Sequence, residues 1–530
     1  MLATYNDVSS GYNDVFIDSG AAFVPSAKLV LDAAFTIAPV PRRLFGSFVE
    51  HMGRCVYTGI YEPGHPTADE DGLRGDVLAL TKEIGPTVVR YPGGNFVSNY
   101  LWEDGVGPRE QRPTRLDLAW HSIETNAFGL HEFDGWAKKV DTEVMMAVNL
   151  GTRGLREACD LLEYTNHAGG TYWSDQRIAN GAKEPFNYKL WCLGNELDGP
   201  WQVGHKTAAE YGRLANETGK AMRLIDSEIE LVACGSSNSS MPTFGEWEST
   251  VLELAYDAVD YISLHAYYDE KDNDPLTFLA AAVNMDNFIE DVIATADAVR
   301  ARGRHKKRIN LSFDEWNVWY VQKFKGDGPR ANRVDWVPNP RLIEDEYTVT
   351  DAVVVGTFLN SLLRHGDRVT VANQAQLVNV IGLLRSEEGG EAWKQTIAYP
   401  FEQMRRLAQG QIVQVVASGD KFDSPTYTDV PFVDTSATYD AAGGRAAIFV
   451  ANRSLDETAI LEVDLRGLGV TSVLDASTLH AGANQNRHTT NLARHDAITP
   501  QRFDDYVLDG GQLKVSLPAL SWTVFSFEAS

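Results

Sequence analysis

The amino-acid sequence predicts an α/β protein: a (β/α)8 TIM barrel with a C-terminal antiparallel β-sandwich of jelly-roll type. Three observations lead to this prediction. The chain has 530 residues, which is more than one hydrophobic core usually serves, so two domains are expected. From about residue 40, short apolar runs alternate with longer stretches of helical spacing, as in a parallel sheet. Beyond about residue 410, short strand-like runs follow one another with turn residues between them.

The first region contains eight strand-like runs, each nearly continuous in Val, Ile, Leu, Phe and Ala. Such continuity is expected when helices cover both faces of a parallel sheet. A doubly wound open sheet also accommodates eight strands, but one helix after each strand up to a count of eight favours a closed barrel. The predicted strands cover residues 43–50, 86–91, 143–150, 190–196, 229–235, 261–268, 308–316 and 368–377.

Helical spacing is clearest over residues 207–225. This stretch begins with the capping-type sequence TAAE and repeats apolar residues about every 3.6 positions, at Tyr211, Leu214, Met222 and Leu224. Residues 155–168 and 278–301 are also predicted to be helical. We expect these helices to cover the outside of the barrel.

The two ends of the chain are predicted to meet in the second domain. Residues 28–37, KLVLDAAFTI, alternate apolar and polar side chains, unlike the barrel strands, so we expect them to pair with the C-terminal sheet. After a helix over 393–410, strands are predicted at 411–417, 446–452, 459–465, 513–517 and 522–527. The predicted parts are a polar arm (1–27), a sandwich strand (28–39), the barrel (40–392) and the sandwich with its leading helix (393–530).

Composition narrows the possible partners. The 47 basic and 73 acidic residues give a net charge of -26, which repels nucleic acids and anionic membranes. The N-terminus lacks the features of a secretory signal and no apolar run approaches about 20 residues, so we expect a cytoplasmic protein without a membrane partner. The four cysteines, Cys55, Cys159, Cys192 and Cys234, are widely spaced and are predicted to be free thiols.

Two glutamates follow predicted strands at the carboxyl end of the barrel, where active sites of such barrels lie. Strand four ends LWCLGNELDGPW with Glu196, and strand seven ends INLSFDEWNVWY with Glu315. Two facing carboxyl groups are what glycosidic cleavage requires, and strands four and seven place them close enough for retention of configuration. Alternatively, each glutamate is an ordinary rim carboxylate in an ion pair. Asp314 is expected to point to the opposite side of its strand.

Aromatic residues suited to sugar stacking surround both glutamates and favour the glycosidase hypothesis. They are Trp201, Trp316, Trp319 and Tyr320. Glu103 and Asp104, in LWEDGVGP, are interpreted as turn residues rather than catalytic acids.

Six segments also carry a resemblance to a known family. They read FGSFVEHMGRCVYTGIYEP (45–63), RYPGGNFVSNYLWEDGVGP (90–108), WCLGNELDGPWQVGH (191–205), ISLHAYY (262–268), DEWNVWY (314–320) and NQAQLVNVIG (373–382). On these segments the chain, from about residue 28 onward, resembles the α-L-arabinofuranosidases of glycoside hydrolase family 51. The polar arm and the loop over 324–337 depart from the family pattern and leave fine specificity open.

The resemblance implies roles for individual residues. Glu196 is similar to the family's acid/base and Glu315 to its nucleophile. Tyr267 resembles the tyrosine that hydrogen-bonds the nucleophile. His265 ends the same strand; a core histidine is the alternative for it, and a packed rim aromatic is the alternative for Trp120. The remaining residues implied to bind or shape the site for the sugar are Glu50, Asn95, Asn195, Gln376, Trp120 and Trp201.

The resemblance thus implies a retaining enzyme that removes terminal α-L-arabinofuranosyl units from arabinose-containing oligosaccharides. It also implies a homo-oligomer, commonly a hexamer, and no cofactor. Three rival hypotheses stay open: a xylanase or β-glycanase of the same barrel type, a noncatalytic carbohydrate-binding protein, and a metal-dependent barrel hydrolase. The 12 histidines show neither HxH nor HExxH spacing, so no metal site is predicted.

Overall fold

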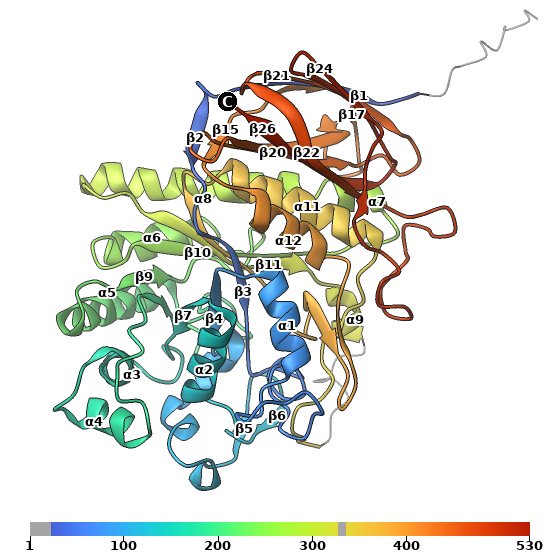
Figure 1. Ribbon diagram of the computed structural model, residues 1–530. Helices are drawn as coiled ribbons and strands as arrows, with labels where there is room; N and C mark the ends of the chain where they lie inside the picture. Colours follow the sequence, from blue (N-terminus) through green and yellow to red (C-terminus); the bar gives the residue numbers. More distant parts are fainter. Residues whose placement is uncertain (1–22, 327–334) are drawn as a thin grey trace, which may run out of the picture.

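The computed structural model describes residues 23–326 and 335–530 (Figure 1). Eight parallel strands close into a barrel in the order β10-β11-β12-β3-β4-β7-β8-β9. Each of the eight predicted runs overlaps one of these strands, so the predicted barrel is confirmed. The strands are β3 (Arg43–Phe48), β4 (Val88–Tyr91), β7 (Glu143–Ala147), β8 (Leu190–Leu193), β9 (Glu230–Ala233), β10 (Tyr261–Tyr268), β11 (Asn310–Val318) and β12 (Val369–Gln374).

Helices cover the outside of the barrel (Figure 1). The predicted cap of α5 is present, because the Thr207 hydroxyl accepts a hydrogen bond from the backbone N–H of Glu210. The helix predicted over 278–301 is divided into α7 and α8. The helices are α1 (Gly75–Ile84), α2 (Leu130–Val140), α3 (Leu155–Asn166), α4 (Tyr172–Ala179), α5 (Ala208–Ile225), α6 (Glu246–Ala255), α7 (Pro275–Leu279), α8 (Ala282–Gly303), α9 (Val321–Gly326), α11 (Val349–Arg364) and α12 (Ala398–Leu407).

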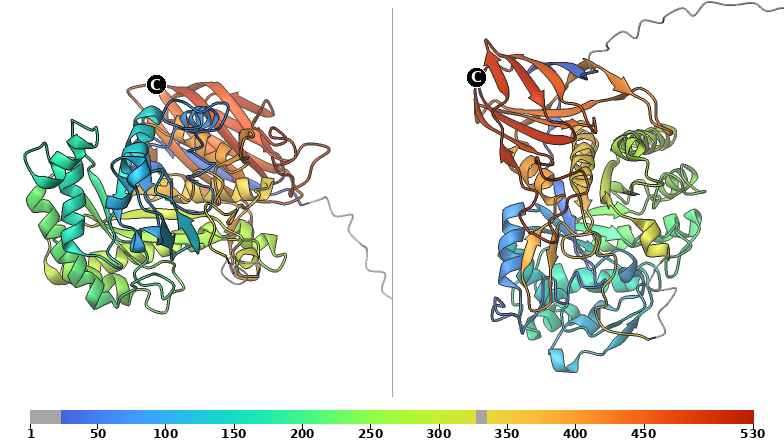
Figure 2. Two further views of the ribbon diagram at one scale, coloured as in Figure 1. Left: turned by 90° about the horizontal axis from the view of Figure 1, so that it is seen from below. Right: turned by 90° about the vertical axis from the view of Figure 1, so that its right-hand side faces the viewer.

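Two sheets form the predicted C-terminal sandwich, which lies to one side of the barrel in both views of Figure 2. Apolar side chains of both sheets, including Leu29, Val463, Ile448 and Phe525, share one core. The larger sheet contains β2 (Thr36–Pro39), β15 (Gln411–Val413), β19 (Val433–Asp440), β20 (Arg445–Asn452), β26 (Ser521–Ala529), β22 (Val470–Leu479) and β23 (Gln501–Arg502). The smaller contains β16 (Val416–Gly419), β1 (Ser26–Asp32), β21 (Ala459–Gly467), β25 (Gln512–Leu517) and β24 (Tyr506–Asp509).

The N-terminal strands complete both sheets of this sandwich (Figure 1). β1 runs parallel to β21 and antiparallel to β16, whereas β2 pairs with β15 of the other sheet. The single strand predicted over 28–39 is therefore wrong in detail. The chain turns between β1 and β2, where the Asp32 carboxylate accepts a hydrogen bond from the backbone N–H of Ala34 at 2.8 Å.

Three other predicted boundaries differ from the structure. Residues 411–417, predicted as one strand, contribute to β15 and β16 in different sheets. The helix predicted over 393–410 is shorter, because Trp393 pairs with Arg385 in a hairpin of β13 (Leu384–Ser386) and β14 (Ala392–Lys394) and α12 follows it. The arm predicted over 1–27 lies mostly outside the described residues, and β1 already begins at Ser26.

The loop between β4 and α2 is the longest of the loops that follow the barrel strands, and it contains secondary structure of its own. It holds three short 3-10 helices, η1 (Asn95–Asn99), η2 (Trp102–Gly105) and η3 (Arg109–Gln111), and a hairpin of β5 (Arg115–Asp117) and β6 (Ser122–Glu124). A further two-stranded ribbon, β17 (Lys421–Phe422) and β18 (Val430–Pro431), lies in the sandwich. All four cysteines are free thiols. Within the described residues, no helix is long and apolar enough to cross a membrane.

Candidate active site

The two glutamates predicted from strand ends meet at the barrel mouth. Glu315 lies within β11, and Glu196 follows β8 in the left-handed backbone region, with φ of 44°. A carboxyl oxygen of Glu196, a carboxyl oxygen of Glu315 and a ring nitrogen of His265 all lie within 4.8 Å of one another. The carboxyl oxygens of the two glutamates therefore approach to 4.8 Å or less, and both side chains are buried.

Glu196 accepts hydrogen bonds on both carboxyl oxygens. The indole N–H of Trp201 contacts Oε2 at 2.8 Å, and His265 Nδ1 lies 2.9 Å from Oε1. The other ring nitrogen of His265 lies 2.9 Å from the Asp314 carboxylate. Burial alone lowers the pKa of His265, but Glu315, Asp314 and Glu196 outweigh this and raise its pKa well above the usual value. An imidazolium that donates to the carboxyl groups of both Glu196 and Asp314 is therefore favoured.

Asp314 departs from the prediction that it points away from its neighbour. Strict alternation would separate Asp314 from Glu315, yet both carboxylates approach the same His265 ring, at 2.9 and 3.6 Å. The pairing of β11 is irregular on both sides, with register shifts near Ser263/His265 on β10 and between Phe313 and Trp316 toward β12. Such an irregularity re-aims side chains, as bulges do beside active sites.

Two donors hold the Glu315 carboxylate. The Tyr267 hydroxyl donates to Oε2 at 2.8 Å, and the Arg90 guanidinium donates to Oε1 at 2.7 Å. Burial, helped by the nearby Glu196 carboxyl, raises the pKa of Glu315 above its usual value, although His265, Arg90 and the Tyr267 hydrogen bond oppose this rise by favouring the ionised form. Arg90 also donates to Asn195 Oδ1 at 2.7 Å, and the Asn195 amide donates to Asn95 at 3.1 Å.

Sequence reasoning did not single out Arg90, although it lies in one of the quoted segments. It is 1% exposed and belongs to the otherwise apolar strand β4. A charged residue inside such a run is the signal that could have identified it, because a buried guanidinium needs carboxylate or amide partners.

Glu50 forms the second part of the site, directly after β3. Its Oε1 accepts hydrogen bonds from the backbone N–H of Phe96 at 2.9 Å and from the Trp120 indole at 2.8 Å. Gln376 donates to Oε2 at 3.1 Å. Burial, opposed by these donors, raises the pKa of Glu50 to about 8. Glu50 is therefore mostly protonated at neutral pH.

Gly94 shows how close Glu50 lies to Glu315. A Cβ atom at Gly94 would lie 3.0 Å from Glu50 Oε2 and 3.2 Å from Glu315 Oε1. The glycine thus gives both carboxyl groups room on one side of the mouth.

All ten residues predicted for the site belong to this hydrogen-bonded arrangement. His265 bonds the carboxyl groups of Glu196 and Asp314, and the Trp120 indole donates to Glu50 while its side chain is packed in the core. Glu196, His265 and Glu315 are also a group of three potential metal ligands among the described residues. However, a protonated His265 offers no lone pair, and Arg90 already neutralises Glu315.

Comparisons with known proteins agree with this geometry. Family profiles described as α-L-arabinofuranosidase 1 domain and α-L-arabinofuranosidase C-terminal domain match residues 80–288 and 314–521. An intracellular exo-α-(1→5)-L-arabinofuranosidase from Streptomyces lividans is 55% identical over 94% of this chain and 74% of its own length. The chain belongs to the α-L-arabinofuranosidases of glycoside hydrolase family 51. It is therefore a glycosidase.

Two further relatives of this family 51 enzyme come from Bifidobacterium longum. An exo-α-(1→6)-L-arabinofuranosidase is 49% identical, and the match covers 96% of this chain and 98% of the relative. The solved structure of the family 51 α-L-arabinofuranosidase AbfB superposes with a TM-score of 0.91 at 48% identity, covering 95% of this chain and all of AbfB. The barrel and sandwich described above are thus the family's architecture.

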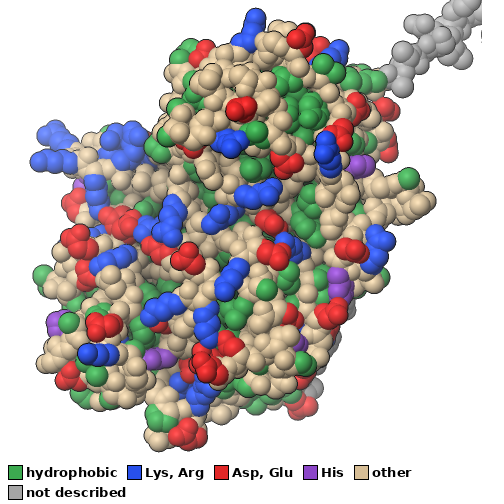
Figure 3. Space-filling view, viewed as in Figure 1, with side chains coloured by type: hydrophobic (Ala, Val, Ile, Leu, Met, Phe, Trp, Pro, Cys, Tyr) green, Lys and Arg blue, Asp and Glu red, His purple; other side chains and the backbone are tan. Residues whose placement is uncertain are grey.

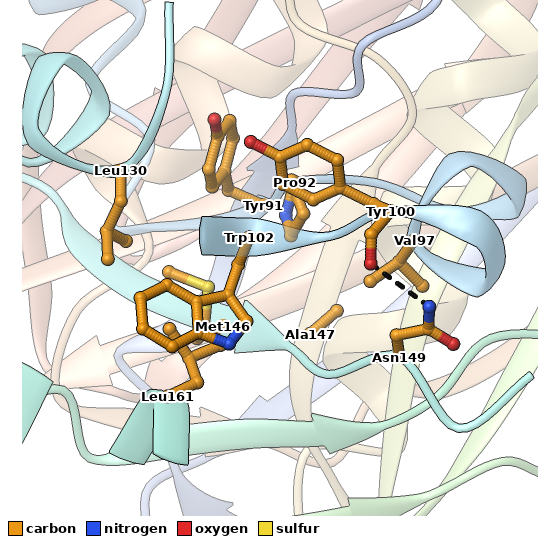
Figure 4. A pocket seen from close by; sticks show the side chains of 10 residues that line it. All are labelled: Tyr91, Pro92, Val97, Tyr100, Trp102, Leu130, Met146, Ala147, Asn149 and Leu161. Carbon is orange, nitrogen blue, oxygen red and sulfur yellow. Dashed lines mark hydrogen bonds between the residues drawn. The ribbon is translucent and has the colours of Figure 1, made fainter. Parts of the chain in front are cut away.

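A small cavity of about 20 Å³ lies beside the active site (Figure 4). Trp102, Met146 and Leu161 line it, and the Asn149 amide donates to the Tyr100 carbonyl at 3.0 Å at its edge. Such a volume accommodates about one water molecule. It is too small for a sugar.

Proposed function

We propose that this enzyme removes terminal non-reducing α-L-arabinofuranosyl residues by double displacement, with retention of configuration. The separation of 4.8 Å or less between the closest oxygens of Glu196 and Glu315 carries the proposal. Retaining glycosidases hold their carboxyl groups about 5 to 5.5 Å apart, whereas inverting enzymes need about 6.5 to 9.5 Å for a water molecule.

In the first step a Glu315 oxygen attacks the anomeric carbon and the glycosidic C–O bond breaks. The departing oxygen takes the proton of Glu196, which leaves that side chain as a carboxylate. The N–H groups of Trp201 and His265 stabilise this carboxylate. Arg90 and Tyr267 donate to Glu315 and favour the ionised form, which is the form that attacks.

In the second step Glu196 takes a proton from water, whose oxygen attacks the anomeric carbon of the arabinosyl-enzyme. The bond to Glu315 breaks, and the same Arg90 and Tyr267 donors receive the released carboxylate. Arabinose leaves with its original configuration, and Glu196 is protonated again.

The groups around Glu50 support removal of a terminal unit. Glu50, Gln376 and Trp120 form one hydrogen-bonded cluster, and Asn95 and Asn195 form another beside Glu315. Together they offer donors and acceptors for the hydroxyls of one furanose ring. That this ring is arabinofuranose is inferred from the family to which the chain belongs.

We infer arabinose-containing oligosaccharides as the substrate class. The relatives' names differ in linkage, (1→5) in one and (1→6) in another, so we propose no single linkage. A cytoplasmic location is supported by the word intracellular in a relative's name. The family resemblance implies a homo-oligomer, commonly a hexamer. This stays a prediction, which light scattering would test. The division into barrel (40–392) and sandwich (393–530) is likewise retained as a proposal.

The decisive experiment follows the first-formed anomer of arabinose by NMR during hydrolysis of an aryl α-L-arabinofuranoside. The α-anomer is expected first, and initial release of the β-anomer would refute retention. Aryl xylosides and glucosides, assayed in parallel, test the xylanase and β-glycanase alternatives.

Azide distinguishes the roles of the two glutamates. With Glu196→Ala, azide should restore turnover of the activated aryl substrate and yield the α-azide. With Glu315→Ala, azide should yield the β-azide, because it replaces the nucleophile. Glu103→Ala is the matched control: this rim glutamate pairs with Arg153 outside the carboxylate cluster, so its loss should leave turnover near that of the unmodified enzyme.

A further inference from the structure

The β5–β6 hairpin carries one member of the Glu50 cluster, by which we mean the hydrogen-bonded group of Glu50, Gln376 and Trp120. The hairpin lies at the opposite end of the molecule from the sandwich (Figure 1). Asp117 ends β5, Ser122 begins β6, and the two residues are paired across the hairpin. The turn between them contains Trp120, whose indole N–H donates to Glu50 at 2.8 Å. The shape of this turn therefore determines where that donor lies.

The Asp117 side chain holds the turn together. Its Oδ1 accepts a hydrogen bond from the backbone N–H of Ala119 at 2.9 Å, and its Oδ2 accepts one from the Ser122 hydroxyl at 3.1 Å. The backbone N–H of Trp120 is a further donor to this carboxyl group. Hydrogen bonds from a side chain to the backbone two residues later fix a turn much as backbone hydrogen bonds do. Asp117 thus bonds the backbone of the residue that carries the indole.

The turn contains a residue in an unfavourable backbone conformation. His121, next to Trp120, has a φ of 52°, in the left-handed region that residues other than glycine rarely adopt. Such a conformation persists only where its surroundings hold it. The His121 ring lies against Trp336, with 3.8 Å between the ring centroids, and Asp117 bonds the turn from within the hairpin. Without the Asp117 carboxyl group the turn should relax, and the indole would move with it.

The base of the hairpin is anchored separately from its turn. Glu124, at the end of β6, accepts a hydrogen bond from the Tyr57 hydroxyl, and His51 Nδ1 lies 2.9 Å from its other oxygen. The backbone N–H of Ile123 donates to the Val337 carbonyl at 3.0 Å. These contacts do not involve Asp117. Loss of the Asp117 carboxyl group should therefore affect the turn more than the strands.

Burial of Asp117 is unfavourable by itself. Acidic and basic side chains lie close to one another over much of the face shown in Figure 3, whereas Asp117 is 3% exposed. Within the described residues no ion pair joins Asp117 to a basic side chain, and Arg115 pairs with Asp104 instead. Burial, opposed by the hydrogen bonds of Ser122 and the turn, raises the pKa of Asp117 to about 6, and the Glu124 carboxyl adds to the rise. Such a carboxyl group beside a substrate pocket is a candidate for a functional role.

We propose that Asp117 is a positioning residue of the hydrolysis: its hydrogen bonds to the turn aim the Trp120 indole N–H at Glu50, which keeps the Glu50 cluster in the arrangement that receives the sugar. The inference rests on the proposed function and adds a residue that acts through Trp120. A carboxyl group that only stabilised the fold would change the melting temperature, but its effect on turnover would not depend on the indole. A double-mutant cycle measures this dependence.

The cycle uses an aryl α-L-arabinofuranoside as substrate. Asp117→Ala removes the acceptors of the turn, and Trp120→Phe removes the indole N–H but keeps an aromatic ring. Each should lower kcat/KM about tenfold, as expected for loss of one hydrogen bond. The double variant should lie within about threefold of Trp120→Phe alone, because both changes remove the same contact. A fall of about 100-fold in the double variant would overturn the proposal, since the two effects would then be independent.

Three further variants make the cycle specific. Asp117→Asn keeps an oxygen acceptor for the turn, and its NH2 can donate to the Ser122 hydroxyl, so kcat/KM should stay within about threefold of the unmodified enzyme. An equal loss in Asp117→Asn and Asp117→Ala would contradict positioning by hydrogen bonds. Glu110→Gln, which removes an exposed carboxylate of η3 in the same loop, should leave kcat/KM unchanged. If Asp117→Ala does not fold, Ser122→Ala replaces it: kcat/KM should fall about threefold alone and not at all beside Trp120→Phe.

Binding of L-arabinose separates this proposal from the proposed function. Calorimetry measures the affinity of the same four proteins for this sugar without turnover, and melting temperatures verify that each is folded. Both single variants should bind more weakly, and the double variant should bind about as well as Trp120→Phe. If the unmodified enzyme hydrolysed no aryl arabinofuranoside, the proposed function would be refuted, and the binding cycle would still decide the role of Asp117. Independent losses of affinity would overturn that role.

Discussion

Replacing Glu50 by glutamine should make the stability of the protein less sensitive to pH. The pKa of this buried carboxyl is raised from 4.5 to about 8, so the native state keeps a proton that the unfolded chain releases. Above about pH 4.5, rising pH therefore favours the unfolded state. The loss of stability continues until about pH 8, where the native carboxyl also ionises.

The size of the effect follows from the two pKa values. Their difference corresponds to about 5 kcal/mol in full, of which roughly 3 kcal/mol accumulates between pH 5.5 and pH 8. Glutamine does not titrate, so Glu50→Gln lacks this contribution. For a chain of this length, about 3 kcal/mol corresponds to about 3 °C in Tm. The difference between the Tm of the variant and that of the unmodified protein should rise by this amount between the two pH values.

The site is able to accept the amide. Its carbonyl oxygen can take the place of Oε1 toward Phe96 and Trp120, and its NH2 would face Gln376. The Oε1 of Gln376 accepts no hydrogen bond from the described residues, so a flip of that side chain would present an acceptor.

Tm is measured by calorimetry at both pH values, with the exposed Glu70→Gln as the control for loss of a carboxylate. If the Tm difference for Glu50→Gln stays constant within about 1 °C, the proton is not held on Glu50 and the reasoning fails.

Three further substitutions test the site. Arg90→Lys keeps the charge but cannot bridge the nucleophile and Asn195, so kcat on an aryl arabinofuranoside should fall about 100-fold; a fall below threefold would contradict its positioning role. Trp201→Phe removes one N–H from the acid/base, so kcat/KM should drop about tenfold for arabinobiose and less for the aryl substrate; equal drops would contradict this. Gly94→Ala should abolish most turnover with an intact circular dichroism spectrum, because its methyl group meets Glu50 and the nucleophile; near-native kcat would show that the pocket yields.

The barrel was predictable because its strands are continuous apolar runs, but β19 was not. This strand reads VDTSATYD and its buried positions include Asp434 and Ser436. Both side chains hydrogen-bond Asn360 of α11, at 2.9 and 2.6 Å. A strand that is buried through polar contacts with a helix shows no hydrophobic alternation, so sequence patterning passes over it.

The site was predictable where side chains at strand ends carry the chemistry. The site was not predictable where a backbone group or the register between strands determines a contact. Phe96 contributes a backbone N–H to Glu50, which no residue type reveals. Asp314 reaches His265 only because the pairing of β11 is irregular, and alternation alone predicts the opposite direction.

The position of β1 has a consequence for how the chain acquires its structure. β1 is not an edge strand: β16 and β21, from the far end of the chain, pair with it on either side. During synthesis its two hydrogen-bonding edges stay unpaired until those strands leave the ribosome, long after the barrel strands have been made. β1, although it lies near the start of the chain, is thus among the last strands to be fixed. Trimming the N-terminus through β1 would open the middle of a sheet rather than shorten its border.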